Sequence, residues 1–261
     1  MEWNKVKSML IALLLVVNIL LGLNIQAQLS AQRADEEESL HLALSLLADA
    51  GAQFDEQLFW NMPRSSAVLL GERSTEREAQ LAGTLLGEAS LNEAGGGVSI
   101  YTSSAGSVTF RSGGLFEAEL NDGTGPEELL GLIVETAAIK GMDYEMSAEG
   151  ESVSAQLLLD GWTVAGAALT CRSTETGALA SGRWYFGSEP VSEGAGVSRA
   201  EMVVALVRIA QERPLDITGL QLVYTQEQLR SGVRLSPAWR IDLGDEQIFL
   251  NGNTAQEVSV E

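Results

Sequence analysis

The end of the chain, from Val233 to Asn251, begins with a segment in which apolar residues recur at every second position. Every second position of its first part is apolar: Val233, Leu235, Pro237, Trp239, Ile241 and Leu243. A period of two predicts a strand with one buried face. A turn at Gly244 and a further apolar run predict a closing hairpin. We expect Pro237, Trp239 and Ile241 to form its structural core, with Trp239 as a buried ring and Pro237 at an edge or bulge.

Four segments carry the signals of helices: residues 30–50, 75–86, 126–141 and 198–213. The first begins with acidic residues, which favour the positive end of the helix dipole, and it ends before Gly51. The segments that open near Thr75 and at Ser198 begin with capping-box patterns. Pro126 suits the first position of the remaining helix, which Thr124 is able to cap.

Between these helices the pattern has a period of two. Residues 98–120 predict three strands with turns at 104–106 and 112–114. One face of these strands is expected to be buried: Val98, Ile100, Val108, Phe110, Phe116, Ala118 and Leu120. Glu117 and Glu119 would then point to solvent.

A second group of strands follows the helix that starts at Pro126. Residues 153–159 and 162–171 are joined by Asp160 and Gly161, a strong hairpin signal. Residues 52–63, by contrast, predict only a short extended piece that ends at a proline.

The front of the chain is its most apolar part. Residues 9–25 are interrupted only by Asn18, Gly22 and Asn24, and Lys5 and Lys7 precede them. Such a segment predicts a single membrane-spanning helix, and the flanking lysines place the N-terminus in the cytoplasm. A cleaved signal peptide is the alternative, but its apolar region would be shorter, and no clean cleavage site is present.

Polar and small residues inside this segment are candidates for contact with a partner helix. An amide at Asn18 seeks a hydrogen bond in the membrane, and a neighbouring helix can supply it. Ser8 and Ala12 form a weak small-xxx-small pair, and Gly22 is a further small residue. The alternative is that a single-pass anchor simply tolerates one asparagine.

Together these elements predict an α+β protein with a single N-terminal transmembrane helix. We expect residues 1–7 in the cytoplasm, 8–26 in the membrane, and two extracytoplasmic subdomains at 27–121 and 122–261. Each subdomain would be a helix followed by an antiparallel meander, with helices on one face of the sheet. This repeat is inferred from the order of the elements alone.

Charge and composition narrow the functional classes. The formal net charge is −20 over 261 residues, with 16 basic and 36 acidic side chains. Nucleic acid is therefore not an expected partner, because phosphate binding needs clustered Lys and Arg. One Cys and one His exclude an intrachain disulfide and cannot build a zinc site by themselves.

No constellation of residues predicts a catalytic, cofactor or metal site. Carboxylate pairs such as Glu117 with Glu119, or Asp242 with Asp245, fall on strand exteriors and turns, where solvated charges are expected. Gly95 to Gly97 lack the Lys and the following helix of a phosphate loop. We therefore expect a non-enzymatic protein without a cofactor.

The two ends of the chain resemble a known family. The opening MEWNKVKSMLIALLLVVNILL, the segment at 40–63 and the closing strands with Tyr224, Pro237 and Trp239 are similar to the YycI/YycH regulators of Gram-positive bacteria. The C-terminal strands are also similar to those of PepSY-like domains. Gly252 departs from this pattern, because alanine is usual there.

This resemblance implies a membrane-anchored accessory regulator. Its partners would be a WalK-type sensor histidine kinase that controls cell-wall metabolism and a YycH-like single-pass protein. Contacts would run through the transmembrane helix and the extracytoplasmic region. The alternatives are a PepSY-like binding or inhibitor module on a generic anchor, and a secreted domain that binds wall polymer.

Overall fold

The computed structural model describes residues 18, 34–63, 67–70, 73–136, 138, 142–185, 190–193, 196–229, 232–244 and 246–258. It confirms the mixed α+β class, with sheets in which antiparallel pairing dominates. The chain divides into two compact units, Met1–Gln53 with Ser198–Leu215 and Phe54–Val197 with Asp216–Glu261. This division falls at other points of the chain than the boundary between 121 and 122.

The first unit contains a helix over residues 34–49 and α5 (Arg199–Glu212). The expected capping box opens α5: Glu201 N donates to Ser198 Oγ at 3.2 Å, and Ser198 N donates to Glu201 Oε2 at 2.8 Å. Apolar residues at helical spacing are buried on both helices: Leu40, Ala43, Leu44, Leu47, Met202, Val203, Ala205, Leu206 and Ala210. The unit is thus built from amphipathic helices.

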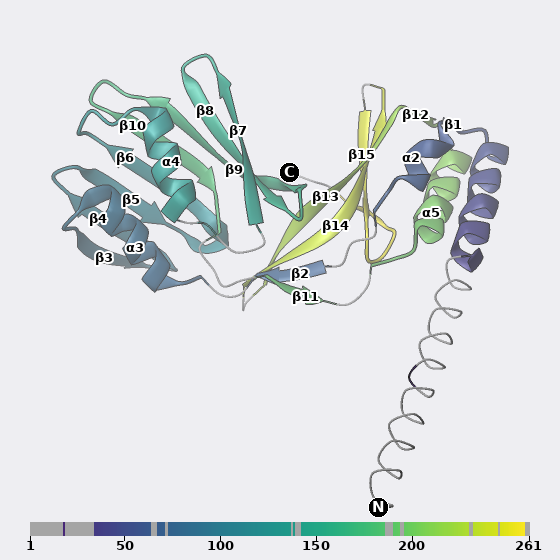
Figure 1. The fold of residues 1–261 in the computed structure, drawn as a ribbon, viewed down its shortest axis with the longest axis horizontal. Coiled ribbons are helices and arrows are strands. Elements are labelled where there is room, and N and C mark those ends of the chain that lie inside the picture. The colour runs from purple at the N-terminus through teal and green to yellow at the C-terminus, as the bar shows by residue number, and fades with distance from the viewer. Residues whose placement is uncertain are drawn as a thin grey trace, which may run out of the picture. The chain divides into compact units, whose positions relative to one another are not determined.

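In the second unit, a helix followed by an antiparallel meander occurs twice (Figure 1). The first pass is α3 (Thr75–Leu86), β3 (Ser90–Gly95), β4 (Val98–Ser103), β5 (Gly106–Phe110) and β6 (Leu115–Leu120), with a short 3₁₀ turn at Ser112–Gly114. The second is α4 (Pro126–Thr136), β7 (Met142–Glu149), β8 (Ser152–Leu159), β9 (Trp162–Ser173) and β10 (Ala178–Arg183). The meanders join where β6 pairs with β10, in the order β7-β8-β9-β10-β6-β5-β4-β3.

Helices α3 and α4 lie on the same face of this sheet, α3 over β4 and β5, and α4 over β8, β9 and β10. The core between them follows the period of two. Val108 and Phe110 on β5, and Phe116, Ala118 and Leu120 on β6, are buried as expected. Glu117 and Glu119 are exposed.

The buried face that the sequence pattern predicted for β4 is wrong. Ser99 and Tyr101 point to the core, and Val98 and Ile100 are only half-buried. Tyr101 lies opposite Val108 in the antiparallel register, and its ring meets Phe110 edge-on at 5.9 Å between centroids. Apolar residues occupy both faces of this strand, so the pattern alone does not choose between them.

A second group of strands lies in the same unit. β13 (Gly219–Leu229) and β14 (Gly232–Leu243) form a long hairpin, continued by β15 (Glu246–Asn251) and β16 (Glu257–Val258). β2 (Ala67–Leu70) pairs with β14, and β11 (Val191–Glu193) pairs with β2. β13 also meets β9 in parallel at the single pair Tyr224 and Val164.

The segment 52–63 also differs from expectation. It holds a short strand, β1 (Gln53–Phe54), and a helix, α2 (Glu56–Trp60), rather than one extended piece. Asp55 starts the helix, because its side chain accepts a hydrogen bond from Gln57 N at 2.9 Å. The remaining short strand is β12 (Asp216–Ile217). The strands β3 and β7 were also missed, since most of their side chains are exposed and polar positions interrupt the alternation.

We predict that Gly182 on β10 cannot be replaced. A Cβ there would lie 2.1 Å from the carbonyl oxygen of Ala168 on the neighbouring strand. Gly182→Ala should lower the free energy of unfolding by about 3 kcal/mol or more, measured by urea unfolding of the full chain. Gly83→Ala is the control, because Gly83 is helical with nothing within 4 Å, and it should raise stability by about 1 kcal/mol. Equal effects of both changes would contradict this account of the strand.

Candidate functional site

The expected membrane-contact residues lie mostly beyond the described part. Ser8, Ala12 and Gly22 are outside the described residues, and Asn18 is present as a single exposed helical residue. Within the described ranges no helix combines the length and the apolar character of a membrane span. The span at 8–26 therefore stays a prediction.

Pro237 lies at the point of β14 where the neighbouring strand on one side ends and another begins. β13 runs along one side of β14, but on the other side β2 pairs with residues 233–235 and β15 with residues 238–243. Pro237 falls in the interval between these neighbours, where its missing N–H leaves no ladder bond unmade. Its carbonyl accepts a hydrogen bond from Gly252 N at 2.5 Å.

This contact also gives a structural reason for a glycine at position 252. A Cβ at Gly252 would lie 2.7 Å from the carbonyl oxygen of Pro237, which is closer than carbon and oxygen normally approach. An alanine therefore requires the chain around Gly252 to move away from β14.

Trp239 joins the sheet to the helix that the sequence did not predict. Its side chain is 4% exposed, and its ring centroid lies 6.2 Å from that of Phe59 on α2. Phe59 in turn meets Phe54 edge-on at 5.5 Å. Ile241, two residues further along β14, is fully buried. These residues form an aromatic and aliphatic cluster of the kind that stabilises a core.

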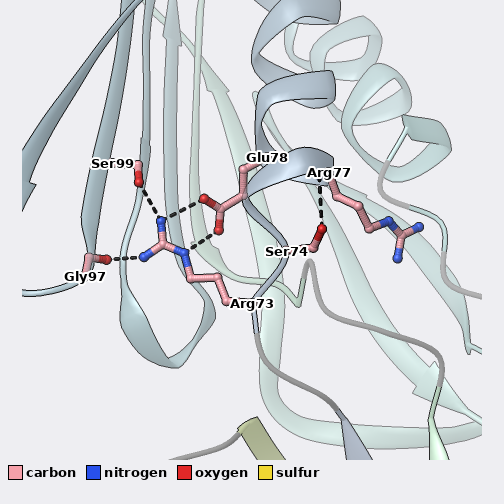
Figure 2. A network of polar contacts seen from close by, with 6 residues as sticks. All are labelled: Arg73, Ser74, Arg77, Glu78, Gly97 and Ser99. Carbon is pink, nitrogen blue, oxygen red and sulfur yellow. Dashed lines mark hydrogen bonds and ion pairs between the residues drawn. The ribbon is translucent and has the colours of Figure 1, made fainter.

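The densest polar arrangement in the described residues surrounds Arg73, just before α3 (Figure 2). Its Nε donates to Glu78 Oε1 at 2.5 Å, and its Nη2 donates to Glu78 Oε2 at 2.7 Å. Nη2 also donates to Ser99 Oγ at 2.8 Å, and Nη1 donates to the carbonyl oxygen of Gly97. Glu78 is 1% exposed, so the fork-like pair is largely withdrawn from water.

This network is a clamp, because it holds the start of α3 against the β3–β4 hairpin. Most of the donors of Arg73 are used, so the group is not presented to a ligand. The glycines at 95–97 form the turn, and all have positive φ, which brings the Gly97 carbonyl to the guanidinium.

The capping box expected near Thr75 is wrong in its details. Ser74 is the N-cap, and its Oγ accepts from Arg77 N at 3.3 Å. Glu78 does not reach back to a cap, because Arg73 holds both of its carboxylate oxygens. No sequence rule separates these roles, since a Ser, a Thr and a Glu at this spacing suit either arrangement.

The other candidate reactive groups are placed as ordinary structural side chains. Cys171 is fully buried on β9 between Val153 and Ala180 of the adjacent strands. Burial raises the pKa of its thiol to about 12. His41 is exposed on the helix over residues 34–49. The described residues contain no group of His, Cys, Asp and Glu arranged to hold a metal ion.

Comparison with known proteins adds no assignment. No family model matches the chain, and curated proteins yield no significant match.

We predict that the Arg73–Glu78 pair is a stability element. Glu78→Gln should lower the free energy of unfolding by about 2–3 kcal/mol, because it leaves a guanidinium without its counter-charge. The loss is smaller than for a fully buried pair, since the Arg73 side chain is 25% exposed. Urea unfolding of the full chain measures it.

The matched control for this change is Glu227→Gln. Glu227 pairs with Arg234 at 3.3 Å, but its side chain is 61% exposed. Water screens this pair, and the change should cost less than about 0.5 kcal/mol. A loss at Glu78 no greater than at Glu227 would show that the clamp is not a stability element.

We also predict that the Cys171 thiol is unreactive in the folded chain. A pKa raised from 9.0 to about 12 lowers its thiolate fraction at pH 8 by about a thousandfold. An aromatic disulfide reagent should therefore label it only after unfolding in urea. Because the unfolded thiol ionises first, stability should fall as pH rises from about 9 towards 12, and Cys171→Ala should remove that part of the slope. Rapid labelling without urea would contradict the burial.

Proposed function

We propose that this chain is a non-enzymatic, membrane-anchored accessory regulator of a WalK-type sensor histidine kinase. It acts beside a YycH-like single-pass partner and tunes the control of cell-wall metabolism. The observation that carries the proposal is the apolar segment at 9–25, preceded by Lys5 and Lys7 and followed by an acidic α+β region. The helix at 8–26 is the anchor, and everything after it is extracytoplasmic.

Contact with the kinase runs through the membrane helix in this proposal. Asn18 supplies an amide that gains a hydrogen bond from a neighbouring helix, while Ser8, Ala12 and Gly22 let helices approach closely.

The extracytoplasmic part gives this contact a second surface. The helix over residues 34–49 is the first described element after the apolar segment. Its Leu42 and Leu46 are 63% and 46% exposed, and residues four apart lie on the same side of a helix. They offer apolar contacts to a partner near the membrane.

Net charge supports the same orientation. The region after the anchor holds most of the 36 acidic residues of the chain, so an anionic lipid surface repels it. Repulsion holds the folded units away from the headgroups and leaves their surfaces open to a partner protein.

We predict a helix contact on the side of the membrane segment that carries Asn18. A photoreactive residue at Leu14, one turn away on the same side, should crosslink a sensor kinase or a second single-pass protein in intact cells, identified by mass spectrometry. The same residue at Val16, on the opposite side, is the control and should give little product. Asn18→Leu should lower the yield at position 14 by roughly threefold to thirtyfold, the value of one interhelical hydrogen bond.

Equal products at both positions, or no partner at either, would contradict a helix-mediated regulator. In that case a PepSY-like extracytoplasmic binding module becomes the better description. Recovery of a mature protein without residues 1–27 would instead favour a secreted wall-binding domain.

A further inference from the structure

One edge of the eight-stranded order in the second unit is a long and regular strand. β7 pairs with β8 from Met142 opposite Leu159 to Glu149 opposite Ser152, without any shift of register. Among the described residues no strand pairs with its other side (Figure 1). The N–H and C=O groups that alternate toward that side form a row of donors and acceptors with no strand partner in the described ranges.

The opposite edge of the same sheet is built differently. β3 carries a register shift between Glu93 and Gly95, where it pairs with β4. Such a bulge bends the strand and interrupts the row of backbone groups, which discourages the addition of another strand. Of the two edge strands of this eight-stranded order, β7 is therefore the one that is regular along its whole length.

The side chains of β7 offer apolar contacts on the face that carries the helices. Tyr144 and Met146 are 41% and 43% exposed, although they lie opposite the buried Leu157 and Ala155 of β8. Helix α4 packs mainly on β8, β9 and β10, so the helical layer leaves this strand largely uncovered. The apolar face of the sheet therefore extends to β7, past the helices that cover the core.

The other face of β7 is acidic. Asp143, Glu145 and Glu149 alternate along it, and all are exposed. Two copies of the chain joined edge to edge with their helical faces aligned would bring these carboxylates opposite one another, which opposes pairing. A partner strand has to supply positive charge instead.

We propose that the β7 edge binds an extended segment of a partner protein that alternates basic and apolar side chains. The segment adds a strand to the sheet through backbone hydrogen bonds. Its apolar side chains contact Tyr144 and Met146, and its Lys or Arg side chains pair with Asp143, Glu145 and Glu149. We draw this from the sheet alone, so it holds whether or not the partner is a kinase.

The test uses the full chain in nanodiscs of zwitterionic lipid and a labelled ten-residue peptide that alternates Lys and Ile. Fluorescence anisotropy at physiological salt should show saturable binding. Hydrogen exchange should slow at every second amide of residues 142–149, those that face away from β8, and stay unchanged at 90–95. A peptide with N-methyl groups along one edge should lose binding, because it cannot complete the ladder.

Charge-reversal variants separate edge binding from general attraction to an acidic protein. Asp143→Lys with Glu145→Lys should weaken peptide binding by about tenfold. Glu117→Lys with Glu119→Lys is the matched control, because it makes the same charge change on the exposed face of β6, an interior strand. The control should change binding by less than about twofold. Equal weakening by both pairs, undiminished binding of the N-methylated peptide, or unprotected β7 amides would each overturn the proposal.

Discussion

The pairing of β6 with β10 is the contact on which the second unit depends. It sets Ala118 opposite Ala180 and joins two separate helix–meander segments into one continuous order of strands. Both alanines are fully buried. Without this pairing each meander would have an additional open edge and only one helix to cover its apolar face, and its core would be too small to be stable.

Small residues in the middle of the sheet make that shared core dense. Ala155, Ala167, Ala178 and Cys171 are fully buried beside the two central alanines. The helices supply the bulk, since Leu81 on α3 and large residues on α4 are also fully buried: Leu129, Leu130 and Ile133. Large helical side chains above small strand residues allow the two layers to approach closely, which gives the packing density that a stable interior needs.

Polar groups have a limited role in this interior. The Arg73–Glu78 pair is withdrawn from water only because the hairpin supplies Ser99 and the Gly97 carbonyl as further partners. The many other carboxylates lie on exterior positions, such as Glu117 and Glu119 on β6. Negative charge therefore covers the surface of the sheet and acts on solubility and on the choice of partners rather than on the fold.

The sequence by itself determined the elements whose signals are local. The capping box at Ser198 starts α5, because the bonds between Ser198 and Glu201 join residues three apart. Asp160 and Gly161 turn β8 into β9, because both adopt positive φ, which these residue types tolerate. Alternation also identified the buried face of β5 and β6, where apolar residues other than Leu115 lie on one face.

Tertiary structure alone decided the features that rest on distant partners. The core face of β4 is set by Tyr101 packing against Phe110, and α2 is held by Phe59 against Trp239, which is far away in the chain. Pro237 fits because β2 and β15 end on either side of it. Glu78 does not cap α3, because Arg73 binds both of its carboxylate oxygens. The packing and hydrogen-bond energies that decide these features come from residues distant in the sequence. The pattern of residues along one segment therefore cannot predict them.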